Sequence, residues 1–144
     1  MARKTTAVNL NKPPSAKAVG AAKATGILER RNAFAKNDPL RVVFVTAPEA
    51  EARKIARTLL EERLVACVNM LKGVQSLYWW EGKIEESAET LLLMKTPASK
   101  INPLRRRVRE LHSYSVPEFI ALAVMEANPA YAEWVLKETE SSVP

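Results

Sequence analysis

The hydrophobic positions between residues 40 and 63 change from a continuous run to a helical spacing. Leu40 to Ala47 is an apolar, β-branched run, which predicts a strand buried on both faces at the centre of a sheet. Apolar residues then recur at the spacing of one helix face, at Ala52, Ile55, Ala56, Leu59 and Leu60. We expect this helix to run to about Arg63 and to pack on the sheet. Thr46 and Glu49 have the spacing of a capping box that would start it, with Pro48 in the first turn.

Two long extended stretches follow, and they predict a hairpin. The first covers Val65 to Trp80 and the second Lys83 to Thr96, with Glu81-Gly82 as the turn. Gly73 predicts a bend or bulge in the first stretch. The first stretch would span roughly 50 Å if straight, whereas a domain of this size has a radius of gyration of about 13 Å. The hairpin must therefore bend sharply or protrude beyond its own sheet.

The remaining chain predicts a helix, a strand and a terminal helix. Thr96 and Pro97 would begin the first helix, whose buried stripe is Ile101, Leu104, Val108 and Leu111, and Pro103 would kink or restart it. Val116 to Met125 predicts a last strand, and Asn128-Pro129 predicts the start of a short helix.

These elements give the order β-α-β-β-α-β with an extra C-terminal helix. Right-handed crossovers favour the third strand between the first and the second. We therefore predict an α+β, ferredoxin-like sandwich with an antiparallel sheet of strand order 4-1-3-2 and helices on one face. The second strand would be an edge strand with unpaired backbone groups.

The predicted hairpin tip carries three aromatic residues, Tyr78, Trp79 and Trp80. Exposed aromatic side chains beside an open sheet edge favour contact with a protein partner, and an identical subunit is the simplest one. The alternative is that the three side chains fold back over their own core.

The positive charge of the chain lies in its N-terminal part. Residues 1–38 contain eight Lys or Arg and two acidic residues, whereas residues 39–144 contain 14 of each. The basic balance therefore gives no reason to expect nucleic-acid binding by the domain at 39–144. We expect residues 1–38 to be a disordered extension, either a solvated tail or an organellar transit peptide. A single Cys and the lack of a long apolar run favour a cytoplasmic protein without a membrane span, and an organellar location is the alternative.

Five segments resemble the CutA divalent-cation tolerance proteins in their order and spacing. They are Val-Thr-Ala-Pro at 45–48, Ala-Cys-Val-Asn at 66–69, Tyr-Trp-Trp-Glu-Gly-Lys at 78–83, Leu-Met-Lys-Thr at 93–96, and Glu-Leu-His at 110–112 followed by Val-Pro-Glu at 116–118. The resemblance covers Arg41 to about Val135. It implies a ferredoxin-like subunit, a homotrimer built through the long hairpins, and an association with copper or another divalent cation. It implies no obligatory cofactor and no established catalytic reaction.

The candidate metal ligands are His112 and Cys67, the only imidazole and the only thiol of the chain. Some members of the family have a second Cys where this chain has Val45 and a second His where it has Leu111, so weak metal binding is expected. Carboxylates of a neighbouring chain could complete such a site, and the candidates are Glu81, Glu89 and Glu118. The alternatives are a core role for Cys67 and a helix-end role for His112.

Two other classes of function are compatible with the sequence. The architecture is similar to that of the PII nitrogen-signalling trimers, in which case clefts between subunits, lined by Trp80, Lys95, His112 and Tyr114, would suit an anionic metabolite. A structural scaffold is the third class. We expect no enzyme activity, because one His, one Cys and no paired-carboxylate spacing leave no base or nucleophile to assign.

Overall fold

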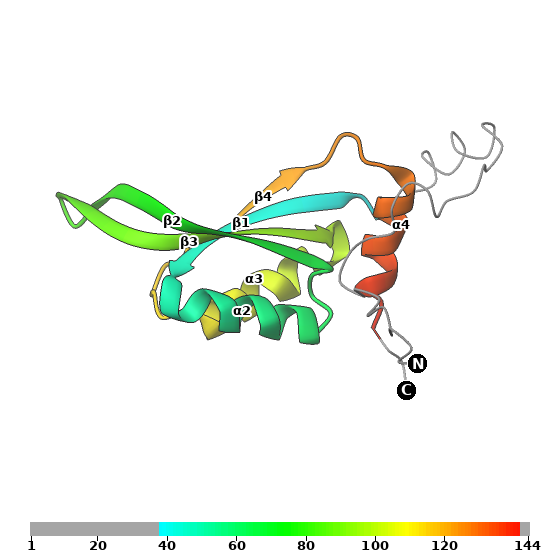
Figure 1. Ribbon diagram of the computed structural model, residues 1–144, viewed down its shortest axis with the longest axis horizontal. Helices are drawn as coiled ribbons and strands as arrows, with labels where there is room; N and C mark the ends of the chain where they lie inside the picture. The colour runs from blue at the N-terminus through cyan, green and yellow to red at the C-terminus, as the bar shows by residue number, and fades with distance from the viewer. Residues whose placement is uncertain (1–37, 142–144) are drawn as a thin grey trace, which may run out of the picture.

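The computed structural model describes residues 38–141, which form one antiparallel sheet and its covering helices. The elements in chain order are β1 (Leu40–Pro48), α2 (Glu49–Glu61), β2 (Cys67–Trp80), β3 (Lys83–Pro97), the 3₁₀ helix η2 (Ala98–Lys100), α3 (Ile101–Leu111), β4 (Ile120–Ala123) and α4 (Pro129–Glu138). The strand order is β2-β3-β1-β4, with every neighbouring pair antiparallel. Helices α2 and α3 cover one face of the sheet, and α4 lies at the end away from the hairpin tip (Figure 1). The predicted ferredoxin-like order 4-1-3-2 with an extra C-terminal helix is confirmed.

The main core lies between the sheet and the helix pair. Alternate residues of β1 and β3 face α2 and α3 and are fully buried, at Val43, Val45, Ala47, Leu92 and Met94. The helices contribute Ile55, Leu59, Leu104 and Val108 to the same cluster. A second, smaller cluster joins Leu40 to the buried face of α4. Burial of these side chains holds the sheet against its helices.

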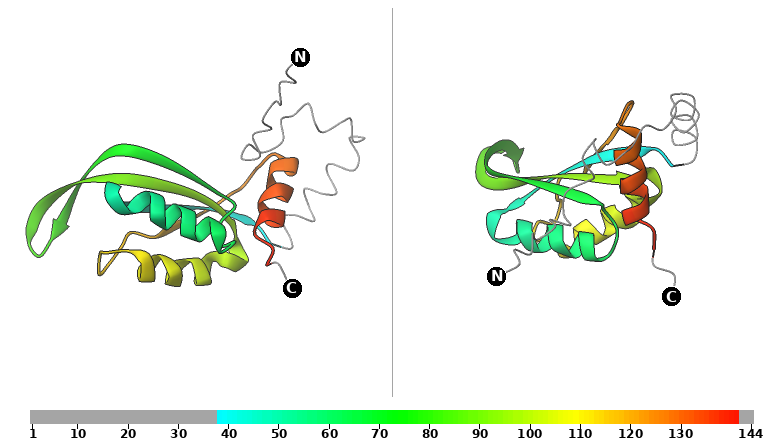
Figure 2. Two further views of the ribbon diagram at one scale, coloured as in Figure 1. Left: turned by 60° about the horizontal axis from the view of Figure 1, so that its bottom comes forward. Right: turned by 45° about the vertical axis from the view of Figure 1, so that its right-hand side comes forward.

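The hairpin of β2 and β3 extends beyond the rest of the sheet, as predicted (Figure 1). Its strands pair from Cys67↔Lys95 to Trp80↔Lys83, with a register shift between Leu71 and Val74. Gly73 lies in this shift with φ 74°, a conformation that glycine adopts without strain. Figure 2 shows the hairpin curving over its length rather than running straight.

Several predicted boundaries were wrong. Thr46 does not cap α2, because it lies within β1 and pairs with Leu91, and Pro48 is at the N-cap without a side-chain bond. Thr96 and Pro97 belong to β3 rather than to a helix, because the ladder with β1 continues to Leu40↔Pro97. Pro103 does not break α3, since it is the third residue, where the N–H has no partner within the helix.

The last strand is also shorter than the predicted Val116 to Met125, because only Ile120–Ala123 pairs with β1. By contrast, the predicted start of α4 is confirmed. The Asn128 side chain accepts a hydrogen bond from the Ala130 N–H at 3.0 Å, with Pro129 at the first helical position.

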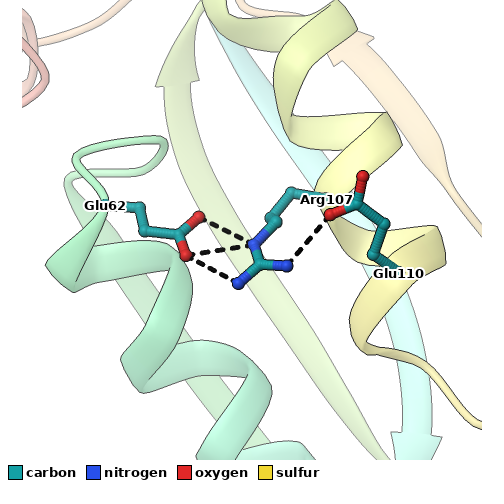
Figure 3. Close-up of polar contacts among 3 residues, drawn as sticks. All are labelled: Glu62, Arg107 and Glu110. Carbon is teal, nitrogen blue, oxygen red and sulfur yellow. Dashed lines mark hydrogen bonds and ion pairs between the residues drawn. The ribbon is translucent and has the colours of Figure 1, made fainter.

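Polar contacts tie the N-terminal end of the domain to the 3₁₀ helix and join α2 to α3. The Asp38 carboxylate accepts bonds from the backbone N–H and the hydroxyl of Ser99 at 2.9 and 2.5 Å. Arg107 of α3 donates to Glu62, just after α2, and to Glu110 (Figure 3). These two carboxylates raise the pKa of Arg107 above its ordinary value. The ion pairs connect α2 to α3 and so help to fix the loop that follows α3. The predictions made for residues 1–37 lie outside the described residues.

Candidate functional site

A groove of about 690 Å³ lies beside the hairpin, where three segments meet. The end of β1 contributes Thr46, the hairpin contributes residues 75–78, Trp80 and Glu89, and the loop after α3 contributes residues 114–116 and Glu118. Alternate hairpin residues Ser76, Tyr78 and Trp80 share one face of β2, as the period of a strand requires. The groove is thus a product of the hairpin curvature and of the loop.

His112 holds this loop against the sheet. Its side chain is buried, at 7% exposure, and its Nδ1 accepts a hydrogen bond from the Tyr114 backbone N–H at 3.1 Å. The Nε2 must therefore carry the proton that is donated to the Thr46 carbonyl oxygen, 2.8 Å away. The imidazole also packs against the Tyr114 ring, with centroids 4.7 Å apart. The Ser113 N–H donates to Glu51 of α2, so the loop is fixed from two sides.

Hydroxyl groups of the hairpin and of the loop lie near Glu89. The Tyr78 and Ser87 hydroxyl groups are 2.8 Å apart. Burial, and then the negative charge of Glu89, raise the pKa of Tyr114 above its ordinary value. Tyr114 is therefore a neutral hydroxyl group close to a buried carboxylate.

Cys67 lies in a different polar cluster at the opposite end of β2. Lys95 contacts the Cys67 Sγ at 3.8 Å and the Asn69 side-chain oxygen, and Tyr131 of α4 lies close to the thiol. Burial, followed by the proximity of Cys67, raises the pKa of Tyr131 to about 12. Cys67 is half-buried and pairs with Lys95 beside Val42, whereas its neighbour Val68 packs against the core. The thiol therefore lies on the sheet face away from α2 and α3, on the side where Tyr131 of α4 lies.

The two predicted metal ligands are not brought together. The His112 side chain is hydrogen-bonded to the carbonyl oxygen of Thr46 in β1. Cys67 lies in β2, two strands away from β1, and in the register of the sheet it is aligned with Val42, four residues before Thr46. No cluster of three or more His, Cys, Asp or Glu side chains suitable for a metal ion occurs among residues 38–141. Within this described part of the chain, the two predicted ligands therefore lie apart.

The other predicted site residues divide between the groove and its surroundings. Tyr78, Trp80, Glu89, Tyr114 and Glu118 all line the groove. Glu81 lies in the hairpin turn, and Lys95 lies beside Cys67. Trp79 is 73% exposed and does not line the groove.

The sequence reasoning missed the polar residues of the hairpin wall. Ser76 and Ser87 pair across the two strands, and Gln75 also lines the groove. The signal that could have found them is the period of two from Tyr78 back to Ser76, combined with the register that the turn at Glu81-Gly82 imposes.

Comparison with known proteins places these features in one family. Residues 41–138 match the family model described as CutA1 divalent ion tolerance protein. The rice (Oryza sativa subsp. japonica) protein named "Protein CutA 1, chloroplastic" is 44% identical over 105 residues, which are 72% of this chain and 59% of the rice protein. The chain thus spans less than two thirds of the length of this relative.

Solved structures agree over the domain. The divalent cation tolerance protein (Cut A1) of Thermus thermophilus is 45% identical with a TM-score of 0.68, covering 70% of this chain and 99% of that one. The structure described as a PII-like protein CutA from Nostoc sp. PCC 7120, in apo form, is 36% identical with a TM-score of 0.67, covering 69% and 97%.

Proposed function

Because the chain belongs to the CutA1 divalent ion tolerance protein family, we propose that it acts as a homotrimer in the response to copper or another divalent cation. The observation that carries this proposal is the protruding hairpin, which a single subunit leaves largely uncovered. We assign no catalytic reaction to it. Among residues 38–141, no helix has the length and apolar content needed to cross a bilayer.

The two edges of the sheet support assembly. Strand β2 is one edge and β4 is the other, and each leaves a row of backbone groups unpaired. All four residues of β4 are exposed in the single subunit, including Ile120 at 48% and Leu122 at 46%. Pairing of the hairpin edge of one subunit with β4 of the next would cover both edges, and such a contact closes into a ring when the rotation permits.

Trp79 is the strongest candidate for the centre of this interface, because its indole is mostly exposed and lies beside the exposed Leu77 and opposite Ile84. Tyr78 and Trp80 would contact the neighbour from the side of the groove. Hydrogen exchange of the full chain tests the geometry. We expect slow exchange of the amides of residues 76–80 and 120–123. Rapid exchange of both segments in a folded protein would contradict edge pairing.

For metal binding we propose a weak Cu(II) site at His112, with Cys67 contributing only if its thiol is accessible. Imidazole suits Cu(II), but both ring nitrogens already form hydrogen bonds, so a metal must displace one of them. This competition explains why weak rather than tight binding is expected. Carboxylates of a neighbouring subunit, with Glu81 in the exposed hairpin turn as one candidate, would complete the site.

Titration of copper, zinc and cadmium into wild type, His112→Ala and Cys67→Ala tests this site. We expect the His112 variant to lose copper affinity by at least about tenfold, since a good ligand contributes more than about 1.4 kcal/mol. Ser113→Ala is a matched control, because only the backbone N–H of Ser113 is used in the structure. Equal copper affinity in all four proteins would refute the site.

We propose that the protein is located in the cytoplasm, with an organelle as the alternative. The name of the rice relative includes the word chloroplastic, which supports the alternative. Residues 1–37 fused to a fluorescent protein would distinguish the two, because only a transit peptide directs the fusion into an organelle.

A further inference from the structure

The charged side chains that line the groove beside the hairpin are all acidic. Its lining residues include two carboxylates, Glu89 and Glu118, and none is Lys, Arg or His. Three aromatic side chains, Tyr78, Trp80 and Tyr114, line the same space. The volume of about 690 Å³ lies within the range of small-molecule sites, which is about 300–1,000 Å³. This combination of carboxylates and aromatic rings disfavours an anion and suits a cation.

Glu89 is the most constrained acidic group of the groove. It is 5% exposed, and the Tyr114 hydroxyl lies close enough for the carboxylate to raise the Tyr114 pKa. No Lys or Arg forms an ion pair with Glu89 within residues 38–141. A buried carboxylate is stabilised by a positive partner, and a nearby neutral hydroxyl does not supply that charge.

The lining favours an organic cation over a metal ion. Ca²⁺ requires six to eight oxygen ligands and transition metals prefer nitrogen or sulfur, whereas the groove offers two carboxylates and hydroxyl groups. Ammonium and guanidinium groups instead bind both carboxylates and the faces of Trp and Tyr rings. Trp80 and Tyr78 provide such rings beside the acidic residues.

We propose that the groove between the hairpin and the loop at 112–119 binds a small organic cation with an ammonium or guanidinium group. Glu89 is the buried charge partner, Glu118 is a second acceptor, and Trp80 contributes its ring. The wall is fixed before binding, because His112 holds the loop to β1 and the Tyr78–Ser87 contact holds the hairpin side chains. The main ligands differ from those of the copper proposal, since neither His112 nor Cys67 lines the groove, and only Glu89 and Glu118 are candidates for both.

Calorimetry of the assembled full-length protein with agmatine and putrescine tests the proposal, with isopentanol as an uncharged probe and acetate as an anionic probe. We expect both amines to bind and the other two probes not to bind. Glu89→Gln keeps the size of the side chain and removes its negative charge, so it should weaken amine binding at least about tenfold. Glu126→Gln changes an exposed carboxylate outside the groove and should have no effect.

A second variant and two control measurements distinguish an amine site from a metal site and from loss of assembly. Trp80→Leu should weaken amine binding, and light scattering on every variant shows whether assembly is preserved, so a binding loss is read only in assembled protein. If copper or zinc binds with a dependence on Glu89 whereas agmatine and putrescine do not bind, the groove is a metal site and the proposal is wrong. Absence of amine binding at millimolar concentration would by itself overturn the proposal.

Discussion

Replacement of His112 by alanine tests whether this side chain holds the loop at 112–119 to the sheet. The change removes the bond from Nε2 to the Thr46 carbonyl and the bond from the Tyr114 N–H to Nδ1. Each buried hydrogen bond contributes about 1 kcal/mol, and a backbone group left without a partner costs about 1–3 kcal/mol. Because water can reach part of the vacated space, we expect the free energy of unfolding to fall by about 2–4 kcal/mol.

Urea unfolding at a fixed chain concentration measures this change, since the stability of an oligomer depends on concentration. His112→Gln retains an N–H donor close to the Nε2 position but not the Nδ1 acceptor, so its loss should be intermediate. Ser113→Ala should unfold like wild type, because the Ser113 side chain forms no bond in the structure. The reasoning is refuted if His112→Ala and Ser113→Ala are equally stable.

Five further changes test contacts and segments in other parts of the molecule. Trp79→Ala should shift assembled protein towards lighter species in sedimentation, because a central interface aromatic commonly contributes about 2 kcal/mol or more; an unchanged distribution would place Trp79 outside the interface. The contribution of Tyr131 to stability should be constant below about pH 10 and fall between about pH 10 and 12, since the unfolded Tyr131 ionises near 10 and the folded one near 12; this part of the loss should vanish in Tyr131→Phe. Arg107→Ala should lower the melting temperature only slightly, because its ion pairs are largely exposed to water, and a drop as large as that of His112→Ala would contradict this reasoning. Removal of residues 1–37 should leave the melting temperature unchanged, whereas Asp38→Ala should cost about 1 kcal/mol through loss of the bonds to Ser99.

The strand order and the long hairpin could be predicted from the sequence, because each depends on patterns that are local or nearly so. The two extended stretches with the turn at Glu81-Gly82 identify the hairpin, and the helical stripe from Ala52 to Leu59 identifies α2. The crossover rule then leaves few ways to arrange them. Asn128-Pro129 marked the start of α4 for the same reason, since its capping bond lies within three residues.

The errors arose where a tertiary contact prevails over a local signal. Thr46 and Glu49 form a capping-box spacing, yet the ladder with β3 holds Thr46 in the strand and His112 binds its carbonyl group. Thr96 is likewise retained in β3, where its hydroxyl donates to the Leu64 carbonyl oxygen at 2.7 Å. Contacts over 32 and 66 residues are not visible in a local pattern.

The candidate functional site could also be predicted only in part, because it depends on tertiary contacts. Tyr78 and Trp80 could be named from the sequence as groups of the hairpin tip. Glu89, Tyr114 and Glu118 could be named as groups of a possible cleft between subunits, but the convergence of all five on one groove of a single subunit could not. That convergence depends on the bulge at Gly73 and on the loop held by His112. Lys95, expected in the same cleft, lies instead with Cys67 at the other end of β2.

The oligomeric mass of the full chain is the most direct test of the proposed assembly. Size-exclusion chromatography with multi-angle light scattering at micromolar concentration should give three times the 16.0 kDa mass of one chain. A folded species of 16.0 kDa with its hairpin free in solution would contradict the account.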